Sequence, residues 1–534
     1  TTPPRRARAW ALLFDAPEAH FRDFLGGELR HQGGFELVWA QGKTSLAGFA
    51  LRPGRDERTL ELLDDRGVVM LFADHLHMTL DRKTKRLEIF NADLRISEHL
   101  ASFMGRPELT GHSVGTLAFG AHAEPPAGVT VSPEGSCPPN WTGIVDVALI
   151  DMSSVTQTER SGGRLSMTPS ARLKNVGTAD VPWYTKFTGS HPPHNNSQHP
   201  FLVWALYQID GPVFRQLGVS DVKHAFLTIN SNCTGCSVDS HILGLGCEDV
   251  YSQGTNTSYG SLSLRPEITA HTGIWKEIGS HFDQNGDGIQ DHPPNNPDSG
   301  FDHRLDVPEA ELDVAGARYF FEAWYVVRDD VNIFNTMGYR EINPTQAVSG
   351  NWSFPNLTSF ISGPALNTWV NPTTPPAGSA NQTLDTGEGH LQLAVSTTDL
   401  GGGQTRYVYA LMNHDFDRQI KSFSVPIGSG VTVSNPIFFD LDDDANNDWT
   451  VSVTANAITW TLPGGATQGL DWGTMHTFGF EANATPGPFD ATLGVFEAGA
   501  PTALSIGTLG AGSNEIFSDG FESNNTSAWS AAVP

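Results

Sequence analysis

The stretch FLVWALYQIDGPVFRQLG, residues 201–218, decides the fold class. Two apolar runs flank the dipeptide Asp210–Gly211, and an Asp-Gly pair in that position favours a tight β-hairpin. Alternation of apolar and polar positions recurs in GVVMLFADHLHMTL (67–80) and TRYVYALMNHD (405–415). This period of two indicates strands of half-buried antiparallel sheets. We therefore expect an all-β protein of tandem antiparallel β-sandwich domains, with an additional β-rich domain at the N-terminus.

Stretches rich in Pro and Gly divide the chain of 534 residues. Within the first part, SEHLASFMG (97–105) predicts one short helix with Ser97 as its N-cap. The predicted order is an N-terminal β-rich domain at 1–121 that could be a removable pro-region, a linker at 122–143, a central β-sandwich at 144–345, a second linker at 346–383, an immunoglobulin-like or fibronectin-like sandwich at 384–500, and a secretion or sorting tail at 501–534.

The formal net charge of −27 limits the classes of partner. Nucleic-acid binding requires clusters of Lys and Arg, whereas this chain has 32 Lys and Arg against 59 Asp and Glu. No apolar run approaches the roughly 20 residues that span a bilayer. We predict no nucleic-acid partner and no membrane span. An extracellular polysaccharide or polymer could bind through exposed aromatic rings, and the oligomeric state is open.

Four segments carry a resemblance to secreted proteins. FSDGFESNNTSAWS (517–530) resembles a tail found at the ends of secreted proteins of Gram-negative bacteria. HPFLVWALYQIDGPVFRQLGVSDVKHAF (199–226), LGLGCEDVYSQGTN (243–256) and GLDWGTMHTFGFEAN with ATLGVFEAG (469–483 and 491–499) are similar to segments of a large, largely uncharacterised family of secreted bacterial β-sandwich proteins with C-terminal sorting tails. The resemblance covers about 144–500. It implies a secreted protein, extracellular or at the cell surface of a Gram-negative bacterium, and it implies no particular activity.

One acidic loop has the spacing of a calcium site. DQNGDGIQD places oxygen donors at alternating positions around Gly288, namely Asp283, Asn285, Asp287, the carbonyl of Ile289, and Asp291. Calcium takes several oxygen ligands, and a glycine at the sixth position permits the turn that brings them together. The segment resembles the loops of dockerins, thrombospondin type 3 repeats and EF-hands, although Pro294 stands where those loops have a bidentate carboxylate. We predict a calcium ion that fastens this loop; a solvated Asn/Asp-rich turn is the alternative.

Histidines are concentrated in the central region, where nine of the 19 lie between residues 191 and 303. Imidazole is a ligand for copper, zinc and iron. The hairpin at 201–218 places His199 near His224, and His241 follows the cysteine loop. We predict a copper or zinc site made of His199, His224 and His241, with His194 as a substitute. Histidines that only form hydrogen bonds in polar loops are the alternative.

Two residues beyond the cysteine loop could support such a metal site. Asp249 and Tyr251 stand two and four residues after Cys247 in the sequence. A ligating histidine usually donates its other N–H to an acceptor. We therefore expect Asp249 and Tyr251 to be hydrogen-bond partners of the ligands, and an ordinary turn is the alternative.

The four cysteines are Cys137, Cys233, Cys236 and Cys247. Thiols of exported proteins tend to oxidise, and four cysteines allow three pairings. We expect Cys247 to pair within its loop and Cys137 to tie the first linker to the central domain. Thiolate metal binding and redox chemistry of the CxxC pair are the alternatives.

Two classes of function fit these patterns. The first is an exported metalloprotein with a histidine site in the central domain, a candidate for a copper-type extracellular oxidoreductase or for metal-assisted hydrolysis. The second is a non-enzymatic, calcium-stabilised cell-surface or matrix adhesion protein that could bind glycans. The sequence leaves the reaction and the substrate open, including whether the chain is an enzyme.

Overall fold

The structure of the protein is a computed structural model that describes twelve ranges of the chain. These are residues 11–14, 21–39, 42–55, 59–74, 76–81, 86–122, 138–194, 198–233, 240–290, 300–348, 350–442 and 444–512. Cys137, Cys236, Asp291 and the tail at 517–530 lie outside the described residues, so the predictions made for them do too.

The predicted fold class is confirmed: the described chain is nearly all β, and its sheets are built from antiparallel pairs. It divides into two compact units, Thr1–Gln208 with Leu217–Ala365, and Ile209–Gln216 with Leu366–Pro534. The predicted hairpin is also confirmed, because β17 (Phe201–Asp210) pairs with β18 (Val213–Val219). Gly211 lies in the turn at φ +55, a conformation that glycine adopts without strain.

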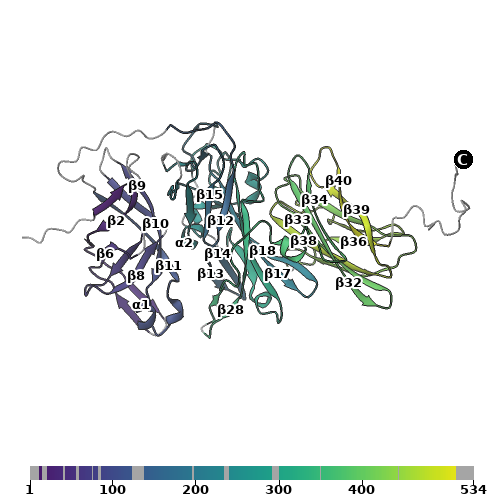
Figure 1. Cartoon of the computed structure of the whole chain (residues 1–534), viewed down its shortest axis with the longest axis horizontal. Coiled ribbons are helices and arrows are strands. Elements are labelled where there is room, and N and C mark those ends of the chain that lie inside the picture. Colours follow the sequence, from purple (N-terminus) through teal and green to yellow (C-terminus); the bar gives the residue numbers. More distant parts are fainter. Residues whose placement is uncertain are drawn as a thin grey trace, which may run out of the picture. The chain divides into compact units, whose positions relative to one another are not determined.

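The N-terminal region of the first unit contains a seven-stranded sheet in the order β11-β10-β8-β7-β6-β3, with β9 paired to β10 (Figure 1). Its short helix begins as predicted, since the Ser97 side chain accepts a hydrogen bond from Leu100 N–H. The elements are β1 (Ala11–Phe14), β2 (Phe21–Gly26), β3 (Leu29–Arg30), β4 (Glu36–Trp39), β5 (Gly42–Ser45), β6 (Ala50–Pro53), β7 (Leu60–Leu63), β8 (Val69–Asp74), β9 (His77–Asp81), β10 (Arg86–Ile96), α1 (Glu98–Phe103), η1 (Pro107–Leu109) and β11 (Ser113–His122).

The central region of the first unit packs a seven-stranded sheet, in the order β22-β19-β17-β26-β27-β30 with β18 on β17, around one apolar core with smaller sheets. Figure 1 shows β12, β13, β14 and β15 grouped with the β17–β18 hairpin. Besides β17 and β18, the elements are β12 (Val147–Asp151), β13 (Val155–Ser161), β14 (Arg164–Pro169), β15 (Ala171–Asn175), β16 (Val181–Pro182), β19 (Val222–His224), β20 (Ile242–Leu243), β21 (Glu248–Tyr251), α2 (Gln253–Asn256), η2 (Tyr259–Ser261), β22 (Leu262–Ser263), η3 (Arg265–Glu267), β23 (Ile268–Thr269), β24 (Ile274–Trp275), β25 (Leu305–Pro308), η4 (Glu309–Leu312), β26 (Arg318–Val326), β27 (Met337–Ile342), β28 (Thr345–Gln346), β29 (Trp352–Ser353) and β30 (Ile361–Ser362).

The second unit contains two five-stranded sheets, β31-β32-β33-β38-β35 and β36-β37-β34-β39-β40, around its own apolar core. In one strand, β34, buried Phe423 and Val425 alternate with more exposed neighbours, as a strand with one core face requires. The elements are α3 (Leu366–Trp369), β31 (Ser379–Asp385), β32 (His390–Gly401), β33 (Gln404–Asn413), β34 (Ile420–Pro426), β35 (Val433–Phe439), β36 (Thr450–Val453), β37 (Ala457–Thr461), β38 (Thr474–Ala482), β39 (Pro486–Val495) and β40 (Ala503–Ala511).

Residues 346–383, expected to be a linker, carry buried side chains. Trp352 and Phe354 belong to the core of the central region, and Val370 is buried as well. β40 falls within the range expected to be a tail. In the described part of the chain, no helix combines the length and the apolar character needed to cross a membrane.

Candidate functional site

The short strand β19 places two titratable side chains in different layers of the central region. Successive side chains of a strand point to opposite faces of its sheet, so Lys223 and His224 point in opposite directions. Both are fully buried, and β19 lies between β17 and β22 in the sheet. On one face His224 meets His199 and Ser263, and on the other Lys223 meets Tyr251.

Two imidazole rings are in direct contact on the first face. His199 Nε2 lies 2.8 Å from His224 Nδ1, and His199 Nδ1 lies 2.8 Å from the carbonyl oxygen of Tyr184. At the other end, His224 Nε2 lies 2.6 Å from Ser263 Oγ. These contacts make a continuous chain of hydrogen bonds, which we call the histidine relay. It uses all four ring nitrogens.

The carbonyl of Tyr184 fixes the direction of the histidine relay. A carbonyl oxygen only accepts, so His199 Nδ1 carries a proton. Burial lowers the pKa of His199 to about 3, so this ring is neutral and its Nε2 accepts from the Nδ1–H of His224. Burial and the neighbouring His199 lower the pKa of His224 too, so its Nε2 accepts from the Ser263 hydroxyl. A hydroxyl, a base and an orienting group in this order are the parts of a nucleophilic triad.

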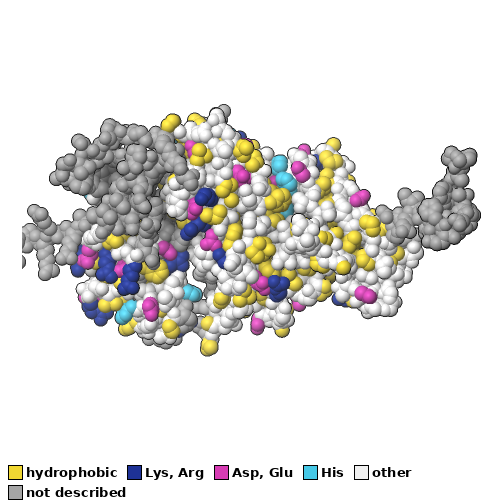
Figure 2. All heavy atoms as spheres, in the orientation of Figure 1, with side chains coloured by type: hydrophobic (Ala, Val, Ile, Leu, Met, Phe, Trp, Pro, Cys, Tyr) yellow, Lys and Arg dark blue, Asp and Glu magenta, His cyan; other side chains and the backbone are white. Residues whose placement is uncertain are grey.

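The histidine relay is closed off from solvent. His224 and Ser263 have 0% exposed surface. The rings of Phe201, Trp275 and Phe282 surround His224, with centroids 5.0, 4.7 and 5.3 Å from its ring. On the face of the molecule in Figure 2, histidine side chains are visible in only a few places. An external substrate has no access to Ser263 in this structure.

On the second face, a lysine amine lies among aromatic rings. Lys223 Nζ is 3.0 Å from the centroid of the Tyr251 ring and 4.8 Å from that of Phe226. Cations are attracted to ring faces, but this Nζ has no hydrogen-bond partner in the described structure. The ring is held in place because the Tyr251 hydroxyl accepts from Trp183 Nε1–H at 2.9 Å and donates to the Phe226 carbonyl at 2.5 Å.

Asp249 stands two residues before Tyr251 on β21 and therefore points to the same side. Its Oδ1 accepts a hydrogen bond from Ile229 N–H at 2.9 Å. Among the described residues, its Oδ2 and the buried hydroxyl of Tyr325 have no hydrogen-bond partner. The Asp249 carboxylate influences the pKa of both Lys223 and Tyr325. A buried polar group without a partner costs about 1–3 kcal/mol, so these groups lower the stability of the folded protein.

Burial makes the uncharged forms of the lysine and the aspartate the favoured ones. It lowers the pKa of the Lys223 amine well below its ordinary value, and it raises the pKa of Asp249 to about 7. Nearby charge works against both shifts, because each group favours the charged form of the other. Desolvation is the larger effect for both.

A disulfide holds β21 in this position. Cys233 and Cys247 are bonded with an S–S distance of 2.02 Å, so the loop that was expected to be stapled does contain a disulfide. Next to it, Ser231 and Glu248 exchange two main-chain hydrogen bonds of 2.8 and 2.7 Å. The disulfide therefore fixes β21, which carries Asp249, close to Ile229, whose N–H binds the Asp249 carboxylate.

The structure brings together two of the predicted metal ligands, His199 and His224. The ring of His241 stacks on Tyr184, with centroids 5.6 Å apart, and His194 Nε2 pairs with the Asp329 carboxylate at 3.0 Å. In the described ranges, His199, His224 and His241 do not form a set of three ligand atoms within 4.8 Å of one another.

Asp249 and Tyr251 do not support the histidine pair in the way that we expected. Both contact the surroundings of Lys223, on the opposite face of β19. The alternation of β19 explains this, because Lys223 and His224 are adjacent residues of one strand.

The described half of the predicted calcium loop is folded on itself by hydrogen bonds. The buried carboxylate of Asp283 accepts from the main-chain N–H groups of Gly279, Asp287 and Gly288, at 3.0–3.1 Å. Asn285 Oδ1 accepts from Asp287 N–H at 2.9 Å, and Ile289 N–H donates to the Asp287 carboxylate. Gly288 has φ +79, where a residue with a side chain would be strained.

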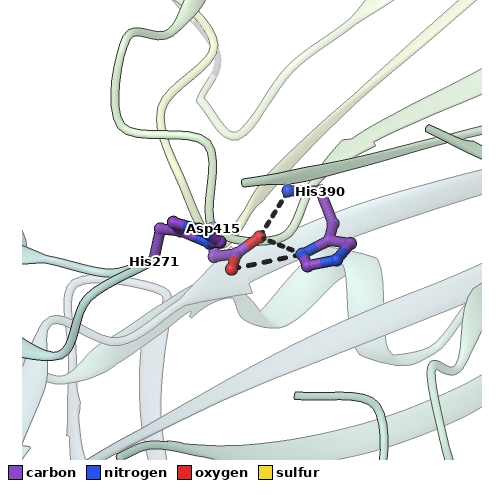
Figure 3. A group of neighbouring side chains, drawn as sticks. All are labelled: His271, His390 and Asp415. Carbon is purple, nitrogen blue, oxygen red and sulfur yellow. Dashed lines mark hydrogen bonds and ion pairs between the residues drawn. The ribbon is translucent and has the colours of Figure 1, made fainter. Parts of the chain in front are cut away.

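Figure 3 shows a pair of possible metal ligands in the second unit, which sequence reasoning did not select. Asp415 accepts from the main-chain N–H of His390 at 2.5 Å, and its Oδ1 lies 3.0 Å from His390 Nδ1. This His/Asp group could contribute to holding a metal ion, because a carboxylate commonly orients a ligating histidine. His271, also drawn in Figure 3, belongs to the first unit, in the turn after β23. Two ligands are fewer than a zinc or copper site requires.

Sequence reasoning also missed Lys223 and Ser263. Lys223 lies in the strand-like run KHAFLTI, where a charged residue among apolar ones is a signal that could have drawn attention to it. Ser263 comes from the two-residue strand β22, which is too short to show a period.

Comparison with known proteins adds no family to this description. No protein-family model matches the chain, and no curated protein matches its sequence.

Proposed function

We propose that this chain is an exported, non-enzymatic β-sandwich protein of the cell surface or extracellular matrix. The observation that carries the proposal is the complete burial of Lys223, His224, Asp249 and Ser263. Enzymes bind substrates in clefts that expose their reactive groups. Groups without exposed surface act on each other and on the fold, which is the behaviour of a structural protein.

Two further features support an extracellular setting. Disulfides form and persist in oxidising compartments, and Cys233 is bonded to Cys247. The Asp283 loop gathers oxygen donors around Gly288. Calcium binds to loops of this kind and fastens them. Calcium is accordingly the ion that we propose for this protein.

The second candidate function is serine-dependent acyl transfer, and the direction of the histidine relay favours it. The Ser263 hydroxyl donates to His224, and His224 donates to His199, so the base is oriented as a nucleophilic mechanism requires. Movement of the covering segment would have to expose Ser263 first. A copper or zinc ion at the same pair, which the sequence also suggested, would have to replace the hydrogen bond between the two rings.

Two measurements on the native protein, labelling with a fluorophosphonate probe and elemental analysis, distinguish a structural protein from an acyl-transfer enzyme and from a metalloenzyme. The structural proposal expects no label on Ser263 and no stoichiometric copper, zinc or iron. A label that disappears in both Ser263→Ala and His224→Gln would overturn it in favour of acyl transfer. Stoichiometric copper or zinc that is lost in His224→Gln would overturn it in favour of a metalloenzyme.

Calcium binding has its own test in the same preparation. Thermal unfolding of the wild type is compared with and without added calcium, next to Asp287→Ala and the matched exposed variant Asp444→Ala. We expect calcium to raise the Tm of the wild type and of Asp444→Ala but not of Asp287→Ala. An unchanged Tm for the wild type would remove calcium from the proposal.

A further inference from the structure

The core of the central region holds an amine nitrogen and a carboxyl oxygen that have no hydrogen-bond partner in the described structure. Lys223 Nζ and Asp249 Oδ2 are both fully buried and both without a hydrogen-bond partner in the described structure. Lys223 comes from β19 in the seven-stranded sheet, whereas Asp249 comes from β21 in a three-stranded sheet. The two residues therefore approach each other across the core from two different sheets.

The two groups are near enough to interact electrostatically, because each affects the charged form of the other. Nζ lies 3.0 Å from the centroid of the Tyr251 ring, and Tyr251 and Asp249 are two residues apart on the same face of β21. Two residues of a strand span about 6.6 Å. The flexible four-carbon stem of lysine can swing Nζ over the ring edge toward the Asp249 carboxyl, whose Oδ1 is held by Ile229 N–H.

We propose that Lys223 Nζ and Asp249 Cγ join in an amide bond that forms inside the folded protein and links the two sheets covalently. In this step the lone pair of Nζ attacks Cγ, and the Nζ–Cγ bond forms as one C–O bond of the carboxyl group breaks. A proton moves from Nζ to the departing hydroxyl, which leaves as water. Nothing is oxidised or reduced, and no co-reactant is required.

The surroundings favour this reaction over the ion pair that the same groups would make in water. Only a neutral amine is a nucleophile, and a carboxyl group loses water most readily when it is protonated. Both groups are fully removed from water, and burial disfavours the charged form of an amine and of a carboxyl group alike. Forming the amide also removes two buried groups that lack partners, each of which otherwise destabilises the fold.

The inference does not rest on the proposed function, because the histidine relay and the calcium loop take no part in it. A covalent link between sheets resists unfolding in a scaffold and in an enzyme alike. Its failure would leave the absence or presence of Ser263 labelling unchanged, so the two proposals fail separately.

Mass spectrometry of the intact, reduced and alkylated full-length protein is the test. We expect the wild type to be about 18 Da lighter than its sequence, the mass of the one water lost when a lysine amine acylates. Trypsin will then fail to cut after Lys223, and residues 216–276 will appear as one lighter peptide. Cleavage at Glu248 will leave the two halves joined through Lys223 and Asp249. A wild-type mass equal to that of the sequence overturns the proposal, whatever the variants do.

Three variants assign the bond to its atoms. Lys223→Met and Asp249→Ala are expected to show the full sequence mass. Lys186→Met is the matched control, because Lys186 is another lysine of the central region, half-buried and with its pKa lowered to about 8, but its Nζ donates to the Gly260 carbonyl at 2.7 Å. A mass deficit that is lost in Lys186→Met, or one that survives in Asp249→Ala, would overturn the assignment.

Discussion

The core of the central region and the core of the second unit differ at the hydroxyl of one buried tyrosine. In the second unit, the hydroxyls of Tyr407 and Tyr409 donate to the carbonyls of Ala484 and Leu509, at 2.9 and 2.8 Å. In the central region the hydroxyl of Tyr325 has no such partner within the described structure. Buried polar groups are normally hydrogen-bonded, so the contrast between these tyrosines shows where the central core lacks a partner that the second unit supplies.

The largest expected effect concerns apolar packing, because each of the two cores contains a large buried tryptophan. Trp204 and Trp460 are both buried in the cores of their regions. Each of Trp204→Ala and Trp460→Ala should lower the free energy of unfolding by about 3–5 kcal/mol, because a large cavity remains. Hydrogen exchange, measured peptide by peptide, should show the loss of protection around β17 for the first variant and around β37 for the second. A loss below about 1 kcal/mol for Trp204→Ala would mean that the central core does not depend on apolar packing.

The second effect should be confined to the central region, because all four cysteines precede residue 248. Removing the 233–247 disulfide in Cys233→Ala/Cys247→Ala releases a loop with a sequence separation of 14 residues. A loop of this size contributes about 3 kcal/mol through the entropy of the unfolded chain. We expect β21 peptides to exchange faster and β33 peptides to stay unchanged. Equal acceleration in both would show that the two regions unfold together.

The third effect depends on pH and has opposite signs for a buried glutamate of the central region and two buried histidines of the second unit. Burial raises the pKa of Glu322 in β26 to about 8, so its contribution to stability is present at low pH and is lost as the pH rises toward 8. Burial lowers the pKa of His414 and His476 in the second unit to about 4 and about 3, so their contribution is lost as the pH falls below 6.5.

Between pH 6.5 and 8 the histidines are neutral in both states, whereas the lowered pKa of Lys223 gives a contribution that changes with pH in the opposite direction to that of Glu322. The contribution of Glu322 is therefore the difference between the wild type and Glu322→Gln. A slope of about 1.4 kcal/mol per pH unit gives a loss of about 2 kcal/mol over that window. Urea unfolding followed by hydrogen exchange should show this loss in β26 and not in β38. Glu322→Gln is the control and should lack this loss; a loss of the same size in the variant would assign it to another group.

Strand alternation made a good part of the fold and of the histidine pair predictable from the sequence. The hairpin turn at Asp210–Gly211 marks the end of β17, and Phe201 pairs with His224 in the register of β17 and β19. His199 lies two residues before Phe201, so proximity to His224 followed from local spacing. The N-cap at Ser97 followed in the same way, from the residues directly beside it.

The rest depended on contacts that local patterns do not encode. β19 pairs with β22 across about forty residues of chain, with Val222 opposite Ser263, and no periodicity announces that pairing. Lysine is almost never fully buried, so composition argues against the position that Lys223 occupies. Residues 346–383 look like a linker because Pro, Gly, Ser and Asn interrupt them, yet Trp352 anchors them in the core.

The smallest expected effect tests the comparison most directly, with one hydroxyl removed from each core. Tyr409→Phe deprives the Leu509 carbonyl of its donor and should cost about 1 kcal/mol. Tyr325→Phe removes a hydroxyl that has no partner in the described structure, so the protein should keep its stability within about 0.5 kcal/mol or gain slightly. Both values come from urea unfolding of the full chain, with hydrogen exchange at β33 and β26 to confirm where each change acts. Should Tyr325→Phe cost as much as Tyr409→Phe, the Tyr325 hydroxyl has a partner in solution, and the contrast between the two cores disappears.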